Sequence, residues 1–133
     1  MRGGADLSTE DIVEIEQLLA YYAHVVDSGD LTLLERIFTD DGVFDCSAAG
    51  GRPYRGIDDI KSLFALGKPP HPPGHHTTNI HVWQDGPTVR VLAKYFVLNG
   101  QTGTGIAGEY RDVVVRKGDG WRFLERVVTQ NYP

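Results

Sequence analysis

The pattern of apolar and polar positions changes from a helical to a strand-like period about half-way along the chain. In the first half, apolar residues recur every three or four positions, as they do on one face of a helix. In the second half, apolar and polar residues alternate in runs that glycine turns separate, as in strands joined by hairpins. This order predicts an α+β fold in which N-terminal helices pack on one face of a curved antiparallel sheet.

Residues that start or stop regular structure set the expected boundaries. Ser8 is a helix cap, acidic residues follow it in the first turn, and Gly29 is a C-terminal stop. A short second helix comes next, then a turn at 39–42 and a short strand over 43–46. The other expected elements are a helix over 57–66, a proline-rich loop over 67–74, strands over 75–83, 88–98, 106–116 and 121–130, and a glycine-rich loop over 99–105.

Composition indicates one globular domain over residues 1–133, with a flexible start at residues 1–7. The net charge of -5, without a cluster of Lys and Arg, is typical of proteins that do not bind nucleic acid. We find no apolar run long enough for a membrane span and no signal-peptide core, so we expect a cytoplasmic protein. Cys46 is the single cysteine, which excludes an internal disulfide and a Cys-based structural zinc site.

Asp27 and Tyr22 are the candidate functional residues of the first predicted helix. Asp27 lies in its last turn, at the border of the apolar face, where a carboxylate can point into a pocket or into solvent. Burial in a pocket would raise the pKa of this carboxyl, and a neighbouring imidazolium would lower it. Tyr22 is either a core residue or a hydroxyl donor to a substrate oxygen.

His75 and His76 compete to be the basic partner of Asp27. Strand alternation puts His76 on the same face as Ile80, which is the more apolar face, and puts His75 on the face of Asn79. A bulge, or a strand that begins only after His76, would allow His75 to face the pocket. Both histidines could instead line the mouth of a loop.

Four stretches together resemble the SnoaL-like branch of the NTF2-like superfamily over nearly the whole chain. They are the YxxxxD spacing of Tyr22 and Asp27, the sequence of residues 28–44, HHTTN at 75–79 and KGDGWRF at 117–123. That superfamily includes scytalone dehydratase, bile-acid 7α-dehydratase, lindane dehydrochlorinase, polyketide cyclases and ketosteroid isomerase. The resemblance implies a cone-shaped α+β barrel, in which helices and a bent antiparallel sheet enclose one deep apolar pocket.

The same resemblance implies roles for individual residues. In the dehydratases, an aspartate at the position of Asp27 pairs with a histidine. The His-x-x-x-Asn pattern of that family fits His75 with Asn79, which leaves His76 as the rival candidate. Tyr22 has the spacing seen in the bile-acid dehydratase, so its hydroxyl could polarise a substrate carbonyl. The predicted catalytic residues are thus Asp27, His75 and Tyr22, and the predicted substrate contacts are Asn79, His76, Cys46, Asn99 and Tyr110.

Two departures from those relatives narrow the chemistry. Ketosteroid isomerases carry a general-base aspartate on the first strand, where this chain has Cys46, and Asp45 would face the opposite side. Scytalone dehydratase uses a second histidine near the position of Asn99. We therefore do not expect steroid isomerisation or scytalone as the substrate.

Other patterns are weaker. His71, His75, His76 and His81 lack zinc-site spacing, and no cofactor motif is present, so we expect neither a metal nor another cofactor. Arg126 is either a cation of the pocket or, as we expect, part of a surface ion pair.

The sequence as a whole predicts a cofactor-independent lyase or isomerase that acts on a hydrophobic, oxygenated small molecule. A non-catalytic ligand-binding or assembly module of the same fold is the alternative. By resemblance we also expect a homodimer, formed through an apolar patch on the open face of the sheet that includes Val113, Val115, Phe123 and Val127, and we expect no nucleic-acid or membrane partner.

Overall fold

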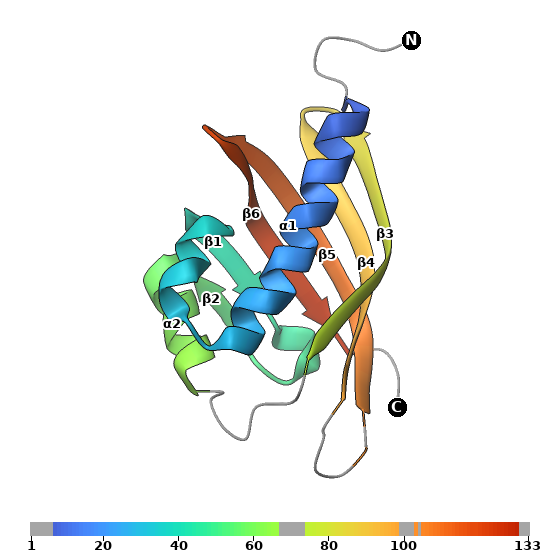
Figure 1. Ribbon diagram of the computed structural model, residues 1–133. Helices are drawn as coiled ribbons and strands as arrows, with labels where there is room; N and C mark the ends of the chain where they lie inside the picture. The colour runs from blue at the N-terminus through green and yellow to red at the C-terminus, as the bar shows by residue number, and fades with distance from the viewer. Residues whose placement is uncertain (1–6, 67–73, 99–102, 104, 131–133) are drawn as a thin grey trace.

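A computed structural model describes residues 7–66, 74–98, 103 and 105–130. One long helix and one shorter helix lie against a six-stranded sheet (Figure 1). Within the described ranges, no helix has the length and apolarity needed to cross a membrane. In chain order, with η for a short 3-10 helix, the elements are α1 (Thr9–Ser28), η1 (Leu31–Arg36), β1 (Phe38–Asp45), η2 (Ser47–Ala49), β2 (Pro53–Arg55), α2 (Ile57–Leu66), β3 (His75–Asp85), β4 (Thr88–Leu98), β5 (Gly105–Lys117) and β6 (Gly120–Thr129).

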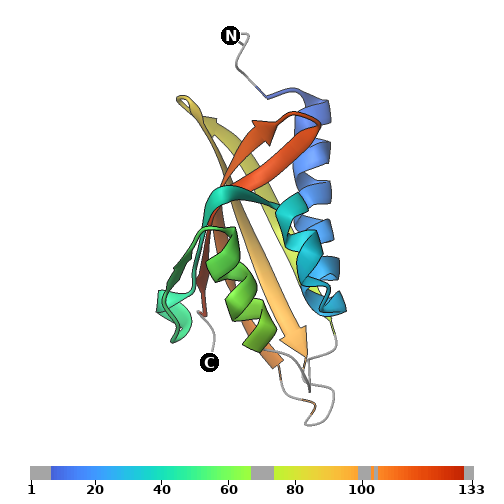
Figure 2. The ribbon, with the colours of Figure 1, turned by 90° about the vertical axis from the view of Figure 1, so that its left-hand side faces the viewer.

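The sheet has the strand order β2-β1-β6-β5-β4-β3, and α1 and α2 lie on the same side of its curved surface (Figure 2). Strands β3 to β6 form the predicted antiparallel meander. However, β1 pairs in parallel with β6, so the sheet is mixed and the expectation of a fully antiparallel sheet was wrong. Sequence neighbours could not indicate this pairing, because β1 and β6 stand at opposite ends of the chain.

Local signals placed the helices correctly. The Ser8 side chain accepts a hydrogen bond from the Asp11 amide, and the Asp11 side chain accepts one from the Ser8 amide, each at 3.0 Å. This reciprocal capping box stabilises the start of α1. Gly29 ends the helix in the left-handed conformation, with φ of 75°. Helix α2 has the predicted bounds.

Four boundary predictions need correction or cannot be compared. Residues 39–42 belong to β1 rather than to a turn, because pairing with β6 continues past them with a register shift. The short strand β2 was not predicted. Leu7, the last residue of the segment 1–7 that was expected to be flexible, is buried in the core, and residues 1–6 lie outside the described residues. Residues 67–73 and most of the glycine-rich loop over 99–105 lie outside the described residues.

Tyr22 of α1 stands at the centre of an aromatic core. Five rings have centroids 5.7–6.5 Å from the Tyr22 ring, and they come from β1, α2, β5 and β6. They belong to Phe38, Phe44, Phe64, Tyr110 and Phe123. These contacts attach the middle of α1 to the concave face of the sheet. Phe123 is therefore a core residue and not part of an outer apolar patch.

Arg126 forms a buried ion pair, which corrects the expectation of a surface pair. Its Nε and one terminal nitrogen donate to the two carboxylate oxygens of Asp112 at 2.8 and 2.9 Å, and both side chains have no exposed surface. The guanidinium carbon lies 3.6 Å from the centroid of the Tyr110 ring and 4.3 Å from that of Tyr22. Burial by itself would lower the pKa of Arg126, but the charge and hydrogen bonds of Asp112 hold this pKa above its ordinary value.

Replacing Arg126 by Met should destabilise the protein by about 3–5 kcal/mol, because Asp112 would be left buried without a partner. The double variant Arg126→Met/Asp112→Leu should recover most of that loss, since it removes both charges. Urea unfolding measures each free energy. As a control, Arg52→Met breaks a surface pair with Asp59 and should cost much less than Arg126→Met, because solvent screens that pair. A double variant as unstable as the single one would contradict the account.

Candidate functional site

Asp27 lies in the last turn of α1, where a carboxylate is locally unfavourable. The helix dipole places partial negative charge at this end, and the last turn contains no basic residue. His75, the first residue of β3, offsets this cost. Its ring Nδ1 lies 2.5 Å from Oδ1 of Asp27, and its backbone N–H donates to Oδ2 at 2.9 Å. One residue thus holds both carboxylate oxygens, which fixes the orientation of the carboxylate and of the imidazole.

Gly74 gives the chain the turn that this arrangement requires. Its φ is 87°, in the left-handed region that side chains other than glycine rarely adopt. A Cβ atom at this position would lie 3.4 Å from Nε2 of His76 and 4.0 Å from Oδ2 of Asp27. Glycine therefore lets the chain enter β3 beside Asp27.

The structure answers which histidine meets Asp27. The side chain of His75 lies on the inner face of the sheet and is 20% exposed. His76 lies on the outer face, where it is exposed and stacks on Phe96 at 4.6 Å between centroids. A bulge between Thr78 and His81 produces this arrangement, and it is one of the two solutions that the sequence allowed.

Tyr22 and Tyr110 are each 2% exposed and lie in the aromatic core. The described contacts of Tyr22 are with aromatic rings and Arg126, and none joins it to Asp27 or His75. Five residues correspond to about 140° around a helix, so the two side chains leave α1 in different directions. Tyr22 therefore has the position of a core tyrosine, which was one of the two interpretations that the sequence left open.

The other predicted substrate contacts are dispersed. Asn79 is exposed on the bulge and His76 is exposed on the outer face, so neither lines the inner face beside His75. Cys46 follows β1, and its Sγ lies 3.5 Å from the carbonyl oxygen of Arg52. Asn99 lies outside the described residues. The structure thus pairs Asp27 with His75, whereas His76 lines a crevice beside His75 without a described hydrogen bond to Asp27, and Asn79 is exposed on the bulge.

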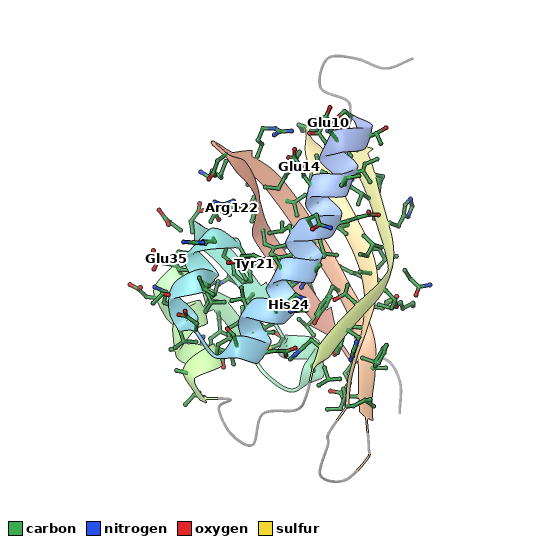
Figure 3. All side chains as sticks on the ribbon, viewed as in Figure 1. Glu10, Glu14, Tyr21, His24, Glu35 and Arg122 are labelled. Carbon is green, nitrogen blue, oxygen red and sulfur yellow. The ribbon has the colours of Figure 1, made fainter. Side chains whose placement is uncertain are left out.

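The end of α1 lies beside the start of β3 (Figure 1). Ile106 of β5 pairs with Val97 of β4 on the inner face, yet 49% of its surface is exposed. A crevice of about 270 Å³ between α1 and β3 also reaches His75. Figure 3 shows His24, which lines this crevice, on the exposed side of α1. The acid–base pair is therefore reachable from solvent.

Sequence analysis missed Thr77, which shares the inner face with His75. Its hydroxyl is buried and has no hydrogen-bond partner among the described residues. The i, i+2 spacing from His75 could have identified it once the face of His75 was known. Within the described ranges, no group of three or more His, Cys, Asp or Glu side chains is arranged to hold a metal ion.

Comparison with protein-family models matches residues 8–127 to the SnoaL-like domain. The chain belongs to the SnoaL-like domain family. An uncharacterized protein of Mycobacterium tuberculosis, Rv2910c, is 35% identical to this SnoaL-like domain over 127 residues, which cover 90% of this chain and 85% of that protein.

Two solved structures from Novosphingobium aromaticivorans share the fold. One, whose name proposes an aromatic ring hydroxylase, is 28% identical, has a TM-score of 0.81, and is matched over 96% of this chain and 93% of its own. The other is named an NTF2-like protein with a cystatin-like fold. It is 24% identical, has a TM-score of 0.77, and is matched over 92% of this chain and 82% of its own. The predicted α+β fold is confirmed.

Tyr22 provides a test of how tightly the aromatic core is closed. Burial raises its pKa from an ordinary value near 10 to about 12, although the positive charge of Arg126 opposes the shift. Below pH 10 the phenol is neutral in both states, so its contribution to stability is complete. As pH rises toward 12, the unfolded chain ionises first and that contribution is lost.

Stability should therefore fall between about pH 10 and pH 12, and less steeply in Tyr22→Phe than in the wild type. Urea unfolding at neutral pH and at about pH 11 measures the difference. Tyr21→Phe, a change at the exposed neighbour, should retain the wild-type dependence. Equal losses in the wild type and Tyr22→Phe would contradict the account.

Proposed function

We propose that this SnoaL-like domain is a cofactor-independent lyase or isomerase that uses Asp27 and His75 as an acid–base pair. The contact of 2.5 Å between the carboxylate and the imidazole carries the proposal. A base oriented by a carboxylate is a recurring arrangement for proton abstraction. Membership of a family related to dehydratases and isomerases supports the same chemistry.

In the proposed mechanism, the Asp27 carboxylate accepts a hydrogen bond from Nδ1–H of His75, which leaves the lone pair of the neutral imidazole on Nε2. Nε2 removes a proton from a carbon next to a substrate carbonyl, and the electron pair of the C–H bond forms an enolate. Asp27 stabilises the resulting imidazolium. In a dehydration, the enolate expels a β-hydroxyl group and the imidazolium returns its proton to form water. In an isomerisation, the proton returns to another carbon.

An apolar, oxygenated substrate suits the surroundings of His75. Ile106 is apolar and half-exposed there, and Val97 pairs with it beside His75. Leu66, at the end of α2, is 81% exposed. The hydroxyl of Thr77 adds a polar group on the same inner face as His75. This combination favours a mainly hydrocarbon molecule with a few oxygen atoms, of polyketide, terpenoid or steroid-like size.

Replacing Asp27 by Asn, or His75 by Gln, should lower turnover by about 100-fold or more while the fold is retained. A panel of β-hydroxyketones and polyketide fragments would serve as substrates, with NMR detecting both loss of water and deuterium uptake next to the carbonyl. His76→Gln is the matched control and should retain turnover, because His76 lies on the outer face. If both site variants turn over like the wild type, the pair is not catalytic. If the wild type binds these molecules without converting them, the ligand-binding module is favoured.

We also propose that two copies associate through the outer face of the sheet. Neither described helix covers this face, and it contains a hollow of about 310 Å³ with apolar walls that include Leu92, Val113 and Val127. Arg111 and Glu125 line the same hollow. Opposite charges on one patch allow each copy to pair with the other across a two-fold axis.

Val113→Arg should convert a dimer to a monomer, because two added charges would face each other across the axis. Sedimentation velocity at several protein concentrations measures the change. Val13→Arg, which adds the same charge at an exposed apolar residue of α1, should leave the mass unchanged. A wild type that is monomeric at all concentrations would refute the dimer.

A further inference from the structure

The bulge in β3 consists of one extra residue with an unusual backbone conformation. Thr78 pairs with Lys94 and His81 pairs with Leu92, so Asn79 and Ile80 together oppose a single residue of β4. The φ angle of Asn79 is 55°, the only positive value at a non-glycine residue in the described part of the chain. Bulges whose first residue is left-handed usually have glycine there.

This extra residue determines which histidine faces inward. The side chains of Ile80 and Val82 pack against the core from the inner face. In a regular strand, alternation back from Ile80 would put His76 on the inner face and His75 on the outer face. The bulge reverses the alternation before it, so His75 is inward, beside Asp27, and His76 is outward against Phe96.

We infer that Asn79 is a positioning residue whose left-handed conformation selects His75, rather than His76, as the partner of Asp27. This role differs from the predicted substrate contact, because the Asn79 side chain is exposed. Its consequence for catalysis rests on the proposed function, whereas its effect on the choice of histidine does not. The His-x-x-x-Asn pattern then has a geometric meaning, since Asn79 is the extra residue of the bulge.

Residue types at position 79 should differ in how readily they adopt the left-handed conformation of the bulge. Glycine adopts a positive φ at no steric cost, and asparagine is among the other residues that tolerate it best. Alanine adopts it less readily, and β-branched valine is the least suited of the four. Exposure of this side chain means that a substitution changes little else, so the effect of each variant reports on backbone conformation.

The test compares Asn79→Gly, Asn79→Ala and Asn79→Val by NMR, without a substrate. The readout is the downfield ring N–H proton of the histidine that donates to Asp27, assigned by its loss in Asp27→Asn and in His75→Gln or His76→Gln. The wild type and Asn79→Gly should show the His75 resonance. Asn79→Val should lose it, and a resonance that depends on His76 should replace it if the strand becomes regular. Thr78→Val replaces the hydroxyl with a methyl group and keeps a β-branched side chain at the neighbouring exposed position, so it should keep the His75 resonance.

A folded Asn79→Val variant with an unchanged His75 resonance would overturn the inference, as would loss of that resonance in Asn79→Gly. If Asn79→Val does not fold, Asn79→Ala decides the question, because alanine at a positive φ is less strained than valine. It should shift the ratio of chains that pair Asp27 with His75 to chains that pair it with His76 by about tenfold. An unchanged His75 resonance in Asn79→Ala would then count against the inference. Failure of the proposed function is distinguishable, because it would appear as normal turnover in Asp27→Asn while the Asn79 series still changed the histidine resonance.

Discussion

The buried pair of Arg126 and Asp112 constrains how the sheet and α1 are arranged, because neither charge can be buried without the other. The two residues face each other across β5 and β6, and a guanidinium without access to water requires its carboxylate partner. Aromatic rings from α1, β5 and β6 surround the guanidinium, and Tyr22 is the one that α1 supplies. The charge pair thus fixes the register of β5 against β6 and holds the middle of α1 against the concave face.

The aromatic core fills the middle of the fold, and the acid–base pair lies outside that core. The aromatic core surrounds Tyr22, while α1 continues for more than a turn to Asp27 in its last turn. There the edge strand β3 supplies His75, which lies between two residues in left-handed conformations, Gly74 and Asn79. Such conformations persist where the surrounding structure stabilises them, and they occur frequently at functional sites. The aromatic core and the site with unusual backbone conformations are therefore separate regions of one fold.

The family accounts for the fold of this chain, and individual side chains carry the proposed reaction. A fold does not determine a function, so this helix-covered curved sheet is compatible with catalysis and with simple binding. The carboxylate bound through both oxygens by His75 is what favours an enzyme. Its location at a helix C-terminus, where the dipole opposes it, indicates that packing stability alone does not explain its presence.

Sequence by itself determined the elements whose signals are local. The Ser8 cap, the glycine after α1, the bounds of α2 and the hairpins of the C-terminal half all followed from neighbouring residues, and the family resemblance added the cone shape and the pairing of Asp27 with a histidine. Tertiary structure decided what depends on distant partners. The parallel pairing of β1 with β6, the burial of Arg126 and the core position of Tyr22 require contacts between segments far apart in sequence. The choice of His75 over His76 required the bulge at Asn79, because one extra residue reverses the faces of a strand and alternation alone cannot locate it.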